Sequence, residues 1–123
     1  FAEPITTPGF TYMDSPGYDP CSVTGQIASG ATMIIFTTGR GSVSGYKPSP
    51  CIKLATNNDM YNRMAEDMDI NCGDILTNGV SIAAKGAEIL EKVIAVASGQ
   101  RTFSEELGFG GAEFVPWQIG AVM

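Results

Sequence analysis

Two short stretches decide the fold: Ala31-Thr-Met-Ile-Ile-Phe36 and Cys51-Ile-Lys-Leu-Ala-Thr56. Both are mostly apolar, and residues that favour turns stand directly before them, Gly30 in one case and Pro50 in the other. The first is a nearly continuous apolar run, which is typical of a strand buried on both faces of a parallel sheet. The two stretches therefore predict strands of an α/β domain.

Signals for helices lie next to both predicted strands. Asp19 followed by Pro20 is typical of a helix start, and it predicts a helix over about residues 20–29 with Asp19 as its N-cap. After the second strand, Asn57 or Asn58 can cap another helix.

The clearest helix is expected over residues 81–98. On its polar side, Glu88 and Lys92 are four residues apart, a spacing that predicts an ion pair. On its apolar side, six residues recur at helical spacing: Ile82, Ile89, Leu90, Val93, Ile94 and Ala97.

Two further segments, residues 9–14 and 69–72, are candidates for short strands. The resulting order of strands and helices predicts an α/β fold, a Rossmann-like layered domain with a small, mainly parallel sheet flanked by helices. Residues 1–8 are interpreted as a linker or truncated edge, and residues 9–123 as one domain. Because the chain starts at Phe1 instead of Met, we expect it to be a piece of a longer polypeptide.

The charge of the chain excludes several classes of partner. The formal net charge is −6 with 7 Lys and Arg residues, so a basic surface for nucleic acid is absent. The sequence also contains no polybasic run for anionic lipid and no apolar run of the length that a membrane span needs. We therefore expect neither nucleic acid nor a membrane as a partner.

Cysteine and histidine usage narrows the chemistry. The 3 cysteines, an odd number without a CxxC motif, fit reduced and mostly buried thiols in a cytoplasmic protein. Histidine is absent, which excludes a Ser-His or Cys-His nucleophile pair and an HExxH metal site within this chain.

The candidate site comprises three segments, residues 14–19, 37–47 and 56–58, because ligands of open α/β sheets bind beyond the carboxyl ends of the strands. The loop over residues 37–47 is the most informative of the three. Its glycines have neither the spacing of a dinucleotide fingerprint nor the Gly-Lys-Ser/Thr sequence of a P-loop. Exposed backbone N–H groups and the guanidinium of Arg40 suit an anion, above all a carboxylate. The alternative is a surface loop that needs glycine for its turns.

Other acidic and basic residues are further candidates for a site. Asp14 and Asp19 flank a turn and could bind a cation or act as acid and base, although Asp19 is better explained as a helix cap. The acidic run over residues 66–72 could hold a hard cation, or could simply end a solvated helix. Lys53 is unusual inside an apolar strand and either reaches the sheet end or extends its amine to solvent.

Several segments, taken in order, resemble one enzyme family. They are Phe10-Thr-Tyr-Met-Asp14-Ser-Pro-Gly-Tyr-Asp19, Val23-Thr-Gly-Gln26, Phe36-Thr-Thr-Gly-Arg-Gly-Ser42, Ile52-Lys-Leu-Ala-Thr-Asn57, Glu66-Asp-Met-Asp-Ile-Asn-Cys-Gly73 and Phe114-Val-Pro-Trp117. Together they resemble the C-terminal region of the altronate and galactarate dehydratases, with the large subunit of sulfolactate sulfo-lyase as a relative. The loop ending at Ser42 is more similar to the altronate branch.

The resemblance implies a hydro-lyase of sugar acid catabolism, which eliminates water from an aldonate or aldarate such as D-altronate to give a 2-keto-3-deoxy acid. It also implies a divalent metal, Fe(II) or a similar ion, with ligands outside this chain. For substrate binding we expect Arg40 to hold the carboxylate, with further contacts from Thr38, Gly39, Gly41, Ser42 and Asp14. The catalytic residues and the metal ligands are not assigned, and the fragment alone is expected to be inactive.

The sequence leaves three alternatives open. The same family could act as galactarate dehydratase or as sulfolactate sulfo-lyase. The domain could also be a non-catalytic Rossmann-like module for folding or for contacts within a homo-oligomer, for which the apolar tail with Phe109, Phe114, Val115 and Trp117 offers a surface. We expect that tail to be docked on the domain.

Overall fold

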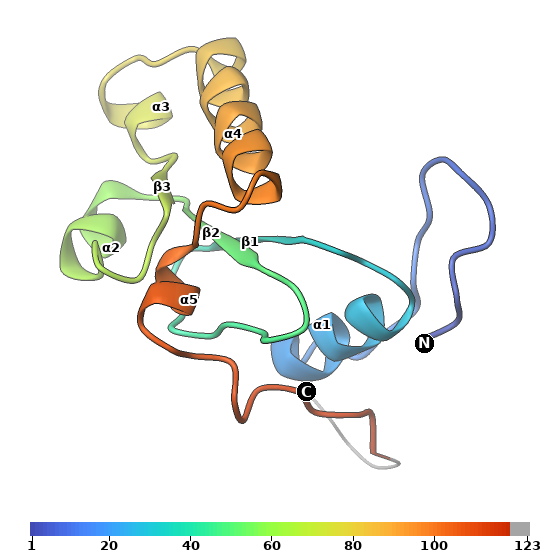
Figure 1. The fold of residues 1–123 in the computed structure, drawn as a ribbon. Coiled ribbons are helices and arrows are strands. Elements are labelled where there is room, and N and C mark those ends of the chain that lie inside the picture. Colours follow the sequence, from blue (N-terminus) through green and yellow to red (C-terminus); the bar gives the residue numbers. More distant parts are fainter. Residues whose placement is uncertain (119–123) are drawn as a thin grey trace.

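A computed structural model describes residues 1–118 and contains a small parallel sheet (Figure 1). Its strands are β1 (Ile34–Thr38), β2 (Cys51–Ala55) and β3 (Ile70–Asn71), in the order β1-β2-β3. Both pairings are parallel, with Ile34 opposite Cys51 and Leu54 opposite Ile70. The predicted α/β fold with a parallel sheet is confirmed, although three strands make "Rossmann-like" a loose description.

Five helices accompany the sheet in the described residues: α1 (Asp19–Ala28), α2 (Asn58–Arg63), α3 (Asp74–Thr77), α4 (Ile82–Ala97) and α5 (Phe103–Glu106). Side-chain caps fix the starts of two of them. The Asn57 side chain accepts a hydrogen bond from the Met60 backbone at the start of α2, and Ser81 accepts one from Ala84 at the start of α4. The predicted helices around residues 20–29, after Asn57 and over 81–98 are confirmed.

The central strand β2 is buried along its whole length. Ile52 and Leu54 point to one face, where they form a cluster with Ile70 of β3 and with Val96 of α4. On the other face, Cys51 contacts a cluster that includes Val23 of α1 and Tyr46, while Ala55 contacts Met60 and Met68. Helix α4 thus covers one face of the sheet, and α1, α2 and the long loop after β1 cover the other.

Strand β1 lies at the edge of the sheet. Its sequence predicted burial on both faces, and that prediction is wrong. Ile34 is buried, but Ile35 is 49% exposed. The reason is that α4 packs over β2 and β3, and the apolar cluster beneath it contains no residue of β1. A continuous apolar run therefore marks a strand here without marking two covered faces.

Three other expectations are corrected. Residues 9–14 form no strand, and Phe10 is 99% exposed. Helix α1 begins at Asp19 with Tyr18 as its N-cap, so Asp19 lies in the first turn and makes no capping bond. The Glu88–Lys92 pair is not formed, because Glu88 pairs with Lys85 and Lys92 lies near Asp69.

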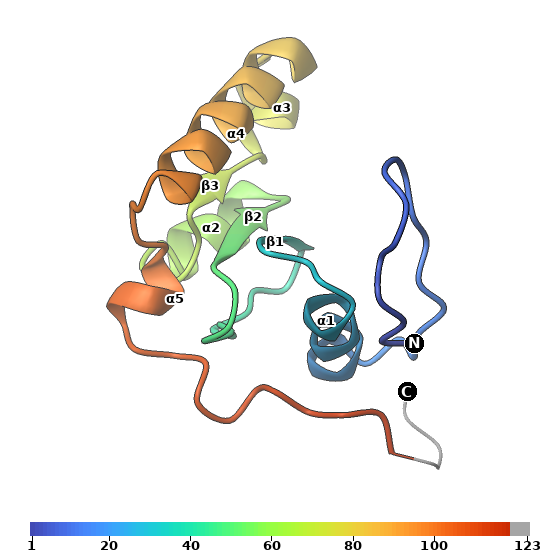
Figure 2. The ribbon, with the colours of Figure 1, turned by 45° about the vertical axis from the view of Figure 1, so that its right-hand side comes forward.

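The two ends of the described chain come together beside α1, as Figure 2 shows. The rings of Phe1 and Trp117 meet edge to face with centroids 5.3 Å apart. The Val115 backbone N–H donates to the hydroxyl of Thr24 in α1 at 2.8 Å. The tail is therefore docked, as expected, by one hydrogen bond and an aromatic contact. None of the helices in residues 1–118 has the length and apolar content that a membrane span requires.

Candidate functional site

The loops that follow β1 and β2 are joined at the carboxyl edge of the sheet. Thr56 donates to the Thr38 carbonyl twice, from its backbone N–H at 3.0 Å and from its hydroxyl at 3.2 Å. The Asn57 amide donates to the Gly39 carbonyl at 2.9 Å while its oxygen caps α2. Two of the three predicted segments, residues 37–47 and 56–58, therefore lie together where ligands of parallel sheets bind.

The backbone conformation of the loop favours glycine at position 41, and two of its glycines are closely packed. Gly41 has φ of +100°, a conformation that side chains disfavour, and a Cβ there would collide with the sulfur of Met64. Its N–H donates to the hydroxyl of Thr38 at 3.1 Å, which closes a tight turn around Arg40. A Cβ at Gly39 would lie 3.2 Å from the Thr56 hydroxyl. The turn is thus held in one shape against α2.

Arg40 stands at the exposed tip of this turn. The ion pairs found in the described residues do not involve it. The Ser42 hydroxyl, by contrast, is bonded to the Ser44 hydroxyl at 2.7 Å. Arg40 therefore presents its guanidinium to solvent from a fixed backbone, an arrangement suited to a carboxylate ligand.

Lys53 of β2 holds the same loop through a hydrogen bond from its side chain. Its side chain is fully buried, and its amine donates to the Ser42 carbonyl at 3.2 Å. Burial lowers the pKa of Lys53, and the negative charges of Asp67 and Asp69 offset this in part. The amine neither reaches solvent at the sheet end nor extends along the surface. It ties the loop to the middle of β2.

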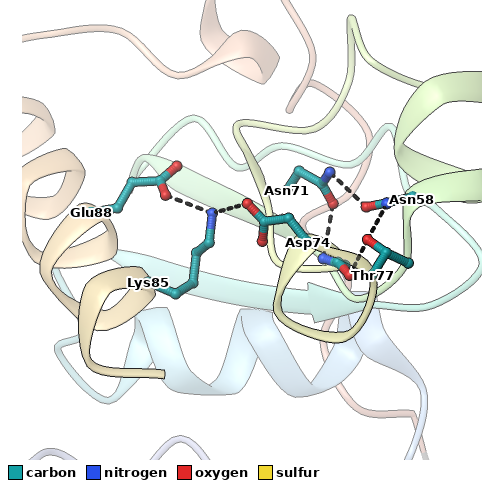
Figure 3. Close-up of polar contacts among 7 residues, drawn as sticks. Asn58, Asn71, Asp74, Thr77, Lys85 and Glu88 are labelled. Atoms are coloured by element: carbon teal, nitrogen blue, oxygen red, sulfur yellow. Dashed lines mark hydrogen bonds and ion pairs between the residues drawn. The ribbon is translucent and has the colours of Figure 1, made fainter. Parts of the chain in front are cut away.

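A second polar cluster lies at the same edge, after β3 (Figure 3). The Asn71 amide donates to Asn58 at 2.9 Å, and Asn58 donates to the Thr77 hydroxyl at 2.6 Å. The Gly73 N–H donates to the Asn71 side-chain oxygen at 2.9 Å, and a Cβ on Gly73 would collide with the Asn58 backbone. This network joins the loop after β2 to the loop after β3.

Beside it, Lys85 of α4 reaches into the cluster (Figure 3). Its buried amine lies 2.8 Å from Asp74 and 2.6 Å from Glu88. Burial lowers the pKa of Lys85, but hydrogen bonds to Asp74 and Glu88 and their charges outweigh it, so the pKa lies above its ordinary value. Among the described residues the second oxygen of Asp74 is buried without a hydrogen-bond partner. Sequence reasoning missed Asp74, Thr77 and Lys85, whereas Asn58 and Asn71 lie in segments that were candidates, residues 56–58 and 66–72.

Asp14 lies apart from the loop around Arg40. It lines a cavity of about 860 Å³ between the N-terminal segment and α1, together with Ser22 and Gln26. None of residues 38–42 lines that cavity. The structure brings Thr38, Gly39, Gly41 and Ser42 together around Arg40, but it gives no shared contact between this group and Asp14.

The acidic run over residues 66–72 has a structural role through Asp69. Its carboxylate is fully buried and accepts hydrogen bonds from the Lys53 N–H at 2.9 Å and the Phe103 N–H at 3.1 Å. Lys92 of α4 lies 3.8 Å away. Asp69 therefore joins β2, α4 and α5, which explains why Lys92 is turned away from Glu88.

Side chains that could bind a metal together and reactive thiols are the other candidates for chemistry in the described residues. Within residues 1–118, no three His, Cys, Asp or Glu side chains are close enough together to hold a metal ion. All three cysteines are free, and Cys21 and Cys51 are buried. Burial raises the pKa of the Cys51 thiol to about 12 and also raises that of Cys72, so neither is an activated nucleophile.

The buried amine of Lys53 makes folding depend on pH. Because its pKa is lowered from 10.5 in the folded protein, the unfolded chain binds more protons between the two pKa values. Stability contributed at this position therefore rises with pH in that window. We expect the free energy of unfolding of the wild type, relative to Lys53→Met, to rise as the pH approaches 10.5 from below, measured by urea denaturation. Lys47→Met, at an exposed lysine, is the control, and parallel pH profiles for wild type and Lys53→Met would contradict the prediction.

Comparison with known proteins identifies the family. Residues 1–122 match the family described as D-galactarate/Altronate dehydratase, C-terminal. The chain is 40% identical to galactarate dehydratase (L-threo-forming) of Escherichia coli over 84% of its length, and 32% identical to altronate dehydratase of Bacillus subtilis over 89%. It is 35% identical to the beta subunit of (2R)-sulfolactate sulfo-lyase of Chromohalobacter salexigens over 87%.

These three relatives are much longer than the matched region. The alignments span 20% of the galactarate dehydratase, 22% of the altronate dehydratase and 28% of the sulfo-lyase subunit. The match runs through the loop around Arg40, the Asn57 and Asn71 contacts and the helix that carries Lys85. The chain belongs to the D-galactarate/altronate dehydratase family and corresponds to its C-terminal region.

Proposed function

We propose that this chain is the C-terminal domain of a sugar-acid dehydratase and that it binds the substrate carboxylate. The observation that carries the proposal is the fixed turn from Thr38 to Ser42, which presents Arg40 at the carboxyl edge of the sheet without an ion pair in residues 1–118. The family match supports the reaction class. The substrate is an aldonate or aldarate.

The reaction breaks the C–H bond next to the carboxylate and the C–O bond of the neighbouring hydroxyl, and forms a carbon–carbon double bond. The resulting enol becomes the 2-keto-3-deoxy acid. Loss of the proton builds negative charge on the carboxylate, which a bidentate guanidinium stabilises. In this proposal Arg40 carries that charge, while the hydroxyls of Thr38 and Ser42 and the N–H groups near Gly39 and Gly41 orient the substrate.

Two parts of the machinery are proposed to lie beyond the described residues. The general base is one, since the chain contains no histidine and its buried thiols are not activated. The other is the ligand set for a divalent metal, for which we propose Fe(II), because residues 1–118 offer no such cluster. The remaining polypeptide is therefore a required partner, and the location of the enzyme is proposed to be the cytoplasm.

Relatives with different printed activities leave the substrate as the finer question. The loop around Arg40 favours altronate, whereas identity along the chain is higher to the galactarate dehydratase than to the altronate dehydratase of Bacillus subtilis. The 35% identity to the sulfo-lyase subunit supports a second candidate, in which sulfite leaves in place of water.

The test is turnover by the natural polypeptide that contains this sequence, assayed with D-altronate, galactarate and sulfolactate, with and without Fe(II). Formation of a 2-keto-3-deoxy acid that depends on Fe(II) is the expected result. If sulfolactate were the one substrate of the three that is turned over, with release of sulfite, the second candidate would be selected. No turnover of any of the three by folded, metal-loaded protein would overturn the proposal in favour of a non-catalytic module.

A further inference from the structure

The outward side of α4 carries a regular apolar stripe. Its residues follow one another at intervals of four, three, four and three, which is the spacing of a seam that packs against another helix. All are exposed, with Leu90 at 58% and Ile94 at 57%. We call this stripe the α4 seam; it consists of Ala83, Ala87, Leu90, Ile94 and Ala97.

The side of α4 that covers the sheet uses different residues. Ile89, Val93 and Val96 contact the core, and Lys85 reaches α3. Helix α4 is therefore apolar on two sides, a pattern typical of a helix that is buried all round. Figures 1 and 2 show α4 at the outside of the molecule, and no helix or strand of residues 1–118 lies over its outer side.

The charges beside the seam describe its partner. Both lysines of α4 point inward, Lys85 to Asp74 and Glu88, and Lys92 to Asp69. The acid left beside the seam is Glu91, which is exposed and forms no ion pair within the described part of the chain. A complementary helix would therefore carry a Lys or Arg at this position.

A second copy of this chain does not meet that requirement. An antiparallel pair of α4 helices centred on Leu90 would bring Glu91 of one copy next to Glu91 of the other. Like charges at such flanking positions disfavour the pairing. A different helix, with an apolar stripe of its own and a basic residue, fits better.

We propose that the α4 seam binds such a helix and that this helix belongs to the same natural polypeptide, outside residues 1–123. The extra length is consistent with the family, since the chain spans only 20% to 28% of the relatives that it matches. Three of the five seam residues are alanine, which lets the backbones of two helices approach closely.

The test is the rate at which a maleimide labels a cysteine placed on the seam. In the natural polypeptide that contains this sequence, we expect Leu90→Cys to react at least about tenfold more slowly than Asp59→Cys, an exposed control on α2, with labelled peptides read by mass spectrometry. Adding Glu91→Lys is expected to speed labelling of Leu90→Cys. Adding Glu106→Lys, a matched charge change on α5, is expected to leave it unchanged.

Each other result overturns the proposal. Equal labelling of Leu90→Cys and Asp59→Cys means that nothing covers the seam. Protection that appears in the 123-residue chain by itself, and rises with its concentration, means that a second copy is the occupant. Protection unaffected by Glu91→Lys means that the partner is not matched by charge. None of these measurements depends on enzymatic activity, so they do not stand or fall with the proposed function.

Discussion

Arg40→Ala is expected to lower kcat/KM for the sugar acid by about 100-fold or more, because a charged group that stabilises a developing anion contributes on that scale. The side chain is exposed and its loss removes no ion pair in the described residues, so folding is expected to be unchanged. The measurement is steady-state kinetics of the natural polypeptide. Arg40→Lys is expected to recover only part of the activity, since a lysine cannot form the two parallel hydrogen bonds of a guanidinium.

Arg101→Ala is the matched control for that experiment. Arg101 is exposed and stands just before α5, and it takes no part in the loop around Arg40. Its substitution is expected to leave kcat/KM unchanged. If Arg40→Ala had the same kcat/KM as the wild type, the substrate carboxylate would be bound elsewhere. Turnover by the wild type would still support the assignment to the dehydratases in that case.

Asp69→Ala is expected to destabilise the protein by about 3 kcal/mol or more. The substitution leaves the N–H groups of Lys53 and Phe103 buried without their acceptor and deprives Lys92 of its counter-ion. Each unsatisfied buried donor costs about 1 to 3 kcal/mol, and breaking a buried ion pair adds to this. Such a loss is a large part of the 5 to 15 kcal/mol that separates typical folded and unfolded domains.

The effect is measured as a shift in the midpoint of urea denaturation, with Glu66→Ala as the control. Glu66 is an exposed carboxylate in the same acidic run, so its removal tests net charge without touching a buried partner. We expect the Glu66 variant to stay within about 0.5 kcal/mol of the wild type. If both variants lost the same stability, the role given to the buried carboxylate would be wrong.

The parts of the fold that could be predicted from sequence are those set by local signals. Asn57 and Ser81 are capping residues next to apolar patterns, and the helices that follow them are found where expected. The failures came from tertiary context. Residues 9–14 have strand-forming side chains but no neighbouring strand to pair with, and Ile35 is exposed because α4 does not extend over the edge of the sheet.

The candidate site was predicted in part for a similar reason. The glycines and Arg40 are adjacent in sequence, so one loop indicated them. The network of Asn58, Asn71 and Thr77 and the pairing of Lys85 with Asp74 join residues 11 to 19 positions apart, and their partners are chosen only by the fold. The one available signal was that Asn71 lies in a predicted short strand, residues 69–72, and it is the last residue of β3.

The parallel arrangement of the strands also governs the order in which the chain can fold during synthesis. Neighbouring strands pair residues 16 or 17 positions apart, such as Ile34 with Cys51 and Leu54 with Ile70, so no hairpin can nucleate the sheet. Non-local pairing of this kind slows folding. The carboxylate of Asp69 obtains its second backbone donor only when Phe103 has emerged. A nascent chain that ends before Phe103 has all three strands and α4, but the buried carboxylate of Asp69 still lacks one of its two backbone donors. We expect chaperones to bind the nascent chain up to this stage.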